Sequence, residues 1–163
     1  MAVYGQPRMR VREQRLYFLF LAAANVFGHS QRRRGALHEE SAMTTRPLVS
    51  VVDDDESVRE SLPDLLKVLG FAARAFPSAE AFLASDCVGH TKCLILDIAM
   101  PGMTGPDLQR ELAHRQQKIP IVFITAHRDD SVRPRVLQQG AVECLFKPFS
   151  DTDLLAALRL AFG

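Results

Sequence analysis

Five polar side chains stand at or just beyond the ends of four short apolar segments. They are Asp53 and Asp54, Asp97, Thr125 and Lys147. In an open parallel α/β sheet the carboxyl ends of the strands share one edge, and ligands bind there. We therefore expect these residues to converge on one acidic pocket that also holds a cation and a hydroxyl. This is the chemistry of a carboxylate that accepts a phosphoryl group.

Three carboxylates in one pocket need a counter-charge, because like charges that lie close raise each other's pKa and destabilise the fold. A hard divalent cation removes this conflict. Mg²⁺ typically binds one or two carboxylates, several waters and phosphate oxygens. With the ion bound, Asp97 stays ionised and can attack phosphorus. Lys147 and Thr125 are then candidates to contact phosphoryl oxygens, and the backbone carbonyl of Ala99 is a candidate metal ligand.

Strand-like and helical patterns alternate five times after residue 46. This alternation, with short connections and nearly continuous apolar strands, predicts a doubly wound five-stranded parallel sheet with helices on both faces. The predicted strands are Leu48–Val52, Phe71–Phe76, Lys92–Leu96, Ile119–Thr125 and Ala141–Phe146. The predicted helices cover 55–69, 78–85, 106–115, a segment capped by Asp130 and ending at Gln139, and a last segment capped by Ser150 or Asp151.

The composition is that of a globular protein, with 163 residues, 47% hydrophobic and 24% charged, and a net charge of +1. Arginines gather in the first 46 residues, whereas the remainder carries more acids than bases. An acidic domain argues against nucleic acid as a direct partner. Cys87, Cys93 and Cys144 lack metal-ligand spacing, so we expect buried or incidental thiols in a reducing cytosol.

We divide the chain into an N-terminal extension, 1–46, and a domain, 47–163. The extension holds an arginine-rich segment followed by the apolar stretch Leu16–Phe27, which is shorter than the roughly 20 residues that span a bilayer. A signal peptide, an amphipathic membrane-surface segment and a translation start called too far upstream all account for it. We favour the third, because Met43 lies directly before the first strand, and expect the extension to be poorly packed.

Four motifs make the pattern more specific: VVDDD at 51–55, LDIAMPGMTG at 96–105, ITA at 124–126 and FKPF at 146–149. They resemble the receiver domain of bacterial response regulators, the CheY-like superfamily. The chain is similar to the receivers of FixJ- and NarL-type regulators, which precede helix-turn-helix output domains. Because no output domain follows here, we expect a stand-alone receiver. The resemblance runs from about Leu48 to the C-terminus and implies the strand order 2-1-3-4-5.

The resemblance also implies a role for each residue of the predicted site. It divides them between the metal and the phosphoryl group. Mg²⁺ is bound by Asp54, Asp97 and the carbonyl of Ala99, with Asp53 acting through water, whereas Asp97 is the phosphoacceptor and Thr125 and Lys147 couple phosphorylation to conformation. A cis peptide bond would join Lys147 to Pro148.

One position departs from the family pattern. Receivers usually carry Tyr or Phe three residues before the lysine, and the ring moves inward on activation. Cys144 stands there in this chain, while Phe146 lies beside Lys147 on the opposite face of the strand. The aromatic part of the usual switch is therefore in doubt.

The resemblance implies a cytoplasmic protein that is phosphorylated by a sensor histidine kinase or a phosphotransfer protein and turns over no external substrate. Its output partner, which is unknown, would bind the face made by the fourth helix, fifth strand and fifth helix. We expect a monomer or a phosphorylation-dependent dimer.

Three alternatives remain. The first is a phosphatase of the haloacid dehalogenase type, which also uses an Asp nucleophile. Such an enzyme needs a second Asp two residues beyond the nucleophile, and Ala99 at that position argues against it. A phosphorylation-independent scaffold with the receiver fold is kept open by Cys144. A fragment of a DNA-binding transcriptional regulator is compatible with an acidic receiver.

Overall fold

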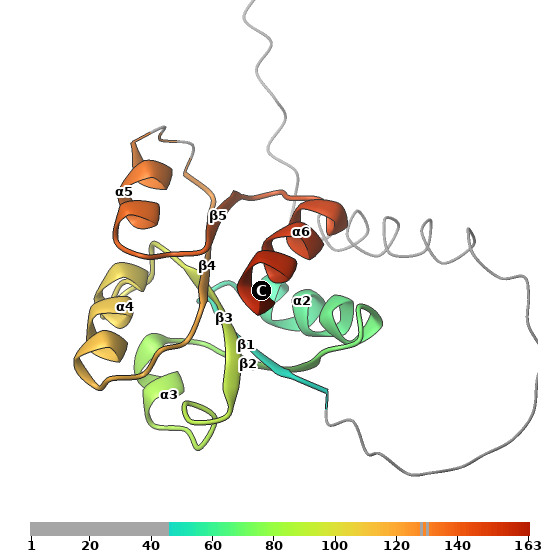
Figure 1. Ribbon diagram of the computed structural model, residues 1–163, viewed down its shortest axis with the longest axis horizontal. Helices are drawn as coiled ribbons and strands as arrows, with labels where there is room; N and C mark the ends of the chain where they lie inside the picture. Colours follow the sequence, from blue (N-terminus) through green and yellow to red (C-terminus); the bar gives the residue numbers. More distant parts are fainter. Residues whose placement is uncertain (1–45, 128, 130) are drawn as a thin grey trace, which may run out of the picture. The chain divides into compact units, whose positions relative to one another are not determined.

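The computed structural model describes residues 46–127, 129 and 131–163, and shows a five-stranded parallel sheet in the order β2-β1-β3-β4-β5 (Figure 1). The predicted fold class and strand order are thereby confirmed. The strands are β1 (Leu48–Val52), β2 (Ala72–Phe76), β3 (Thr91–Asp97), β4 (Ile121–Thr125) and β5 (Glu143–Phe146). The helices are α2 (Glu56–Val68), α3 (Ala79–Leu83), α4 (Gly105–His114), α5 (Val132–Gln138) and α6 (Asp151–Phe162).

Helices cover both faces of the sheet. Figure 1 shows α2 and α6 on one side and α3, α4 and α5 on the other. The central strands are accordingly apolar on both faces, and Leu94, Ile95 and Leu96 of β3 are fully buried. Such strands occur in parallel sheets because crossover helices exclude water from both faces. The core under α3, α4 and α5 includes Phe82 and Phe123.

Side-chain caps define where most of the helices begin. Asp55 accepts a hydrogen bond from the amide of Ser57, and Ser78 accepts one from the amide of Ala81. Capping boxes start α4 and α6, where the N-cap residues are Thr104 and Ser150. Each cap satisfies amides that have no partner inside the helix. Of the two predicted caps for the last helix, Ser150 is therefore the correct one.

Several predicted bounds differ from the structure. β4 begins at Ile121 rather than at residue 119, since Pro120 has no N–H for the ladder. β5 begins at Glu143, because the amide of Ala141 bonds to the carbonyl of Val136 and closes α5. The helix predicted from 78 to 85 ends at 83. Asp130, the predicted cap of α5, lies outside the described residues, and Ser131 at the N-cap position makes no side-chain capping bond.

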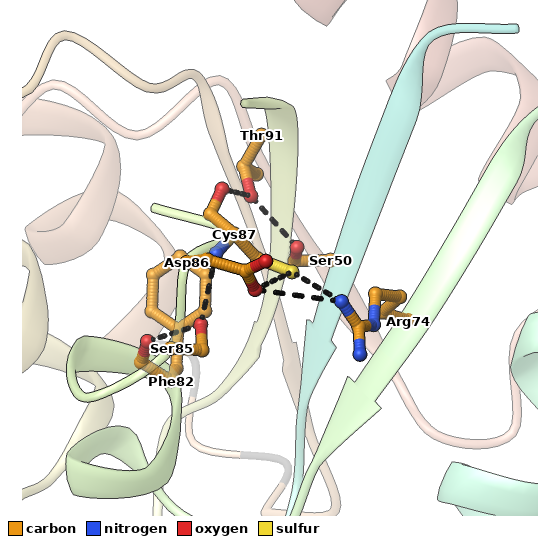
Figure 2. Close-up of polar contacts among 7 residues, drawn as sticks. All are labelled: Ser50, Arg74, Phe82, Ser85, Asp86, Cys87 and Thr91. Carbon is orange, nitrogen blue, oxygen red and sulfur yellow. Dashed lines mark hydrogen bonds and ion pairs between the residues drawn. The ribbon is translucent and has the colours of Figure 1, made fainter. Parts of the chain in front are cut away.

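A polar network, buried at Ser50 and Thr91 and exposed at Arg74 and Asp86, fixes the connection from α3 to β3 (Figure 2). The hydroxyls of Ser50 and Thr91 lie 2.7 Å apart, and the Thr91 hydroxyl donates to the carbonyl of Cys87 at 2.7 Å. A guanidinium nitrogen of Arg74 contacts Cys87 Sγ at 3.3 Å and Asp86 Oδ1 at 3.5 Å. Buried hydroxyls need such partners. The network therefore holds α3 firmly against the sheet.

The predicted extension falls outside this description except for Arg46, so its division from the domain stays a prediction. In the part of the chain that is described, no helix is long and apolar enough to cross a bilayer. Of the two expectations for the cysteines, buried or incidental, the structure shows the first: Cys87, Cys93 and Cys144 are all buried, free thiols.

Candidate functional site

The three predicted acids meet at the carboxyl edge of the sheet. Asp53 and Asp54 directly follow β1, and Asp97 ends the adjacent strand β3. One carboxylate oxygen of each lies within 4.8 Å of those of the other two. Asp53 and Asp97 are buried, whereas Asp54 is exposed. Parallel pairing of β1 with β3 produces this convergence, as the sequence predicts.

Lys147 brings a cation to the acids from the end of β5. Its Nζ lies 2.6 Å from Asp53 Oδ2 and 3.3 Å from Asp97 Oδ1. The amide of Lys147 donates to the carbonyl of Thr125 at 2.8 Å, which fixes its backbone to β4. The predicted cis bond between Lys147 and Pro148 is present. One ammonium group thus bridges two carboxylates that come from different strands.

Burial and charge act against each other in the titration of this cluster. Burial raises the pKa of Asp97 to about 6, an effect that Lys147 opposes and that Asp53 and Asp54 reinforce. Burial also raises the pKa of Asp53 against the opposing charge of Lys147. For Lys147, burial lowers the pKa, but Asp53 and Asp97 outweigh it and the net change is upward. The lysine therefore remains a cation at neutral pH.

Asp53 is held on both of its carboxylate oxygens. Oδ1 accepts the amide of Asp55 at 2.8 Å, and Oδ2 contacts Lys147. The guanidinium of Arg59 donates to the backbone carbonyl of Asp53 at 3.0 Å. Arg59 was not among the residues predicted from the sequence, although α2, which carries it, begins only three residues after Asp53. The direct partners of Asp53 leave the exposed carboxylate of Asp54 as the more open metal ligand.

Thr125 ends β4 and is 1% exposed. Its Oγ1 accepts the amide of His127 at 3.1 Å, so the hydroxyl proton is left to donate elsewhere. The register pairs Asp97 of β3 with Ile124, the residue before Thr125. The hydroxyl thus stands one residue beyond the level of Asp97 at the same sheet edge.

The loop after Asp97 is closed tightly against the strand. The amide of Ile98 donates to the carbonyl of Ile124 at 3.1 Å, and the amide of Gly105 donates to the carbonyl of Ile98 at 3.0 Å. A Cβ on Gly105 would lie 2.3 Å from the carbonyl oxygen of Asp97. Only glycine fits there, because backbone atoms cannot move aside as a flexible side chain can. Ala99, whose carbonyl is a candidate ligand, lies exposed near the base of this loop.

The oxygen donors fit a hard divalent cation. Asp53, Asp54 and Asp97 form the one cluster within residues 46–127, 129 and 131–163 whose His, Cys, Asp and Glu side chains could hold a metal ion. Carboxylate, carbonyl and water oxygens suit Mg²⁺, whereas softer ions favour nitrogen or sulfur. Besides burial, repulsion from the nearby carboxylates of Asp53 and Asp54 raises the pKa of Asp97, and a bound cation would relieve this repulsion.

Cys144 lies in the core rather than at the surface. It is 3% exposed and pairs in register with Phe123 of β4. Burial raises the pKa of its thiol to about 11, so the neutral form dominates at physiological pH. Its neighbour Glu143 accepts two hydrogen bonds from the guanidinium of Arg133 on α5, each at 3.0 Å.

Comparison with known proteins supports the same family. The family description "Response regulator receiver domain" matches residues 49–159. Nodulation protein W of Bradyrhizobium diazoefficiens is 44% identical over 124 residues, which are 76% of this chain and 54% of that protein. The chain spans about half the length of the curated relatives it matches.

Solved structures agree with this result. The response regulator StyR is 45% identical with a TM-score of 0.66, covering 72% of this chain and 59% of that one. The structure of FixJ-N is 38% identical with a TM-score of 0.64, covering 71% of this chain and 92% of that one. The chain therefore belongs to the family of response regulator receiver domains.

Proposed function

We propose that this chain is a phosphorylatable signalling module in which Asp97 accepts a phosphoryl group. The donor is the phosphohistidine of a sensor histidine kinase or a phosphotransfer protein. The observation that carries the proposal is the bridging of Asp53 and Asp97 by Lys147 at the edge where three carboxylates meet. The site therefore combines a buried nucleophile, Asp97, with the cation of Lys147 and with two further acids. This is the arrangement that a phosphate-accepting carboxylate requires.

The transfer forms a bond between a carboxylate oxygen of Asp97 and phosphorus. The P–N bond of the donor breaks, and its electron pair returns to the imidazole. Because the pKa of Asp97 is about 6, the nucleophile is mostly ionised at neutral pH. The protein contributes chiefly by positioning and by neutralising charge. No external substrate is turned over.

Asp54, Asp97 and the carbonyl of Ala99 would hold Mg²⁺ directly, with Asp53 acting through water. When bound, the ion neutralises the acids and the phosphoryl oxygens. The bonds that already engage both oxygens of Asp53 support this division of roles.

Thr125 and Lys147 would report the phosphoryl group to the rest of the domain. The hydroxyl of Thr125 can donate to one phosphoryl oxygen. Lys147 can give up its contacts with the carboxylates and bind a second phosphoryl oxygen instead. Lys147 and Thr125 are joined through their backbones, so a change at one is transmitted to β4 and β5 together. Ligands that contact two conformations differently shift the balance between them.

The output surface would be the face formed by α5, β5 and α6. A groove of about 370 Å³ lies on it, and its lining includes the charged residues Arg133, Glu143 and Asp153 and the apolar residues Phe146, Ala157 and Leu160. An output protein, or a second phosphorylated copy, would bind there. We further propose that the receiver spans 47–163, follows an extension at 1–46 and acts in the cytoplasm.

Intact-protein mass spectrometry after incubation with acetyl phosphate and Mg²⁺ tests the proposal. Wild type is expected to gain one phosphoryl group, whereas Asp97→Asn and wild type in EDTA gain none. The variant Asp64→Asn, which changes an exposed acid on α2, serves as the matched control and should be labelled. No labelling of wild type under conditions that label another receiver would refute the proposal.

A further inference from the structure

Glu80 reaches from α3 to the loop that follows Asp97. Its Oε1 accepts the amide of Met103 at 3.0 Å, a contact between residues 23 positions apart. The same oxygen would lie 2.9 Å from a Cβ on Gly102, whose φ is +75°. The carboxylate therefore packs directly on the turn at 102–103, where a side chain would displace it.

The carboxylate of Glu80 is itself held in place. Hydrogen bonds from its own amide, from the amide of Met103 and from the hydroxyl of Ser78 lower its pKa. The helix that carries it is anchored by Ala79 and Phe82, both fully buried, and by the network drawn in Figure 2. These contacts restrain the position of the Glu80 carboxylate, although the residue lies at the surface.

Most of the loop between Ala99 and Gly102 lies at the surface. Ala99, Pro101 and Gly102 are exposed, and Met100 is the buried side chain among residues 99–102. The backbone bonds of Ile98 and Gly105 close the base of the loop but not its middle. The contact with Glu80 adds a hydrogen bond at Met103, which lies between Ala99 and the base of the loop at Gly105.

We propose that Glu80 is a positioning residue for the Mg²⁺ site, because it holds the loop that presents the carbonyl of Ala99. This inference rests on the proposed function, since it assigns Glu80 to the same metal site. Partners that orient metal ligands typically change affinity about 10- to 100-fold. Glu80 acts from the surface and through the loop, so loss of its carboxylate should weaken Mg²⁺ binding by about three- to tenfold.

Calorimetric titration with Mg²⁺ tests the inference; the chain has no tryptophan to report binding by fluorescence. Glu80→Ala is expected to weaken binding, whereas Glu80→Gln, which keeps an oxygen acceptor for the amide of Met103, should stay within about twofold of wild type. Glu111→Ala is the matched control, because it removes an acid of α4 whose partner, Arg115, is the C-cap residue at the end of that helix away from the loop.

Amide hydrogen exchange in the metal-free protein provides the second readout. The amide of Met103 should exchange faster in Glu80→Ala and at the wild-type rate in Glu80→Gln. Wild-type Mg²⁺ affinity in Glu80→Ala would overturn the inference, even if the variant melts at a lower temperature, because a merely stabilising contact would behave in that way. Absence of Mg²⁺ binding by wild type would instead overturn the proposed function, and with it the inference.

Discussion

Asp97→Asn should stabilise the metal-free protein, by an amount that depends on pH. Asp97 is 5% exposed, and burial is the main reason that its pKa rises from 3.8 to about 6. Lys147 offsets part of this effect, and the nearby carboxylates add to it. The ionised carboxylate is therefore less stable in the folded protein than in the unfolded chain. Asparagine keeps the shape of the side chain but removes the charge.

The sign and the size of this change in the free energy of unfolding follow from proton linkage. A raised pKa means that the folded state binds more protons, so stability falls as pH rises through the interval between about 4 and 6. At roughly 1.4 kcal/mol per pKa unit, the shift corresponds to about 3 kcal/mol above pH 7. Well below pH 4 the carboxyl is protonated in both states, and this contribution disappears.

Urea unfolding in EDTA measures the difference directly. With a denaturant slope of about 1–3 kcal/mol/M, the midpoint of Asp97→Asn should exceed that of wild type by about 1 M or more at pH 8. The two midpoints should converge as the pH falls, and most of the difference should be lost by pH 4. Asp64→Asn is the matched control, because it makes the same substitution at a carboxylate that is 75% exposed. Added Mg²⁺ should stabilise wild type more than Asp97→Asn, since the ion binds only to the folded site.

Two results would refute this reasoning. One is a variant no more stable than wild type at pH 8, which would mean that burial does not penalise the charge of Asp97. The other is a gain of the same size at pH 4 and pH 8, which would assign the gain to packing or hydrogen bonding rather than to ionisation.

Further predictions concern the loop and the output face. Gly105→Ala should destabilise the protein by about 3 kcal/mol or more, because its Cβ would overlap the carbonyl oxygen of Asp97; urea unfolding checks this, and a loss below 1 kcal/mol would contradict it. The ion pair between Arg133 and Glu143 should contribute only about 0.5–1 kcal/mol, since the arginine side chain is 49% exposed. A double-mutant cycle with Arg133→Gln and Glu143→Gln measures that coupling, and high salt should reduce it.

Much of the fold was predictable because its signals are local. Apolar β-branched runs, helical spacing and capping residues mark each element without reference to the others, and a parallel sheet then places all strand ends at one edge. For this reason the gathering of Asp53, Asp54, Asp97 and Lys147 at one sheet edge could be predicted from the sequence. The bounds of β4 and β5 were less predictable, since they depend on which amides are left for the ladder after a proline or a helix end.

Contacts between distant segments could be established only from the tertiary structure. The sequence places an acid in the first turn of α3 and a glycine in the loop after Asp97, but neither pattern says that Glu80 binds the amide of Met103 or that Gly105 lies against a carbonyl. The raised pKa of Asp97 likewise depends on how deeply the folded chain buries it. Residue type and spacing predict which groups gather, whereas distance and burial set their charge, hydrogen bonds and tolerance of substitution.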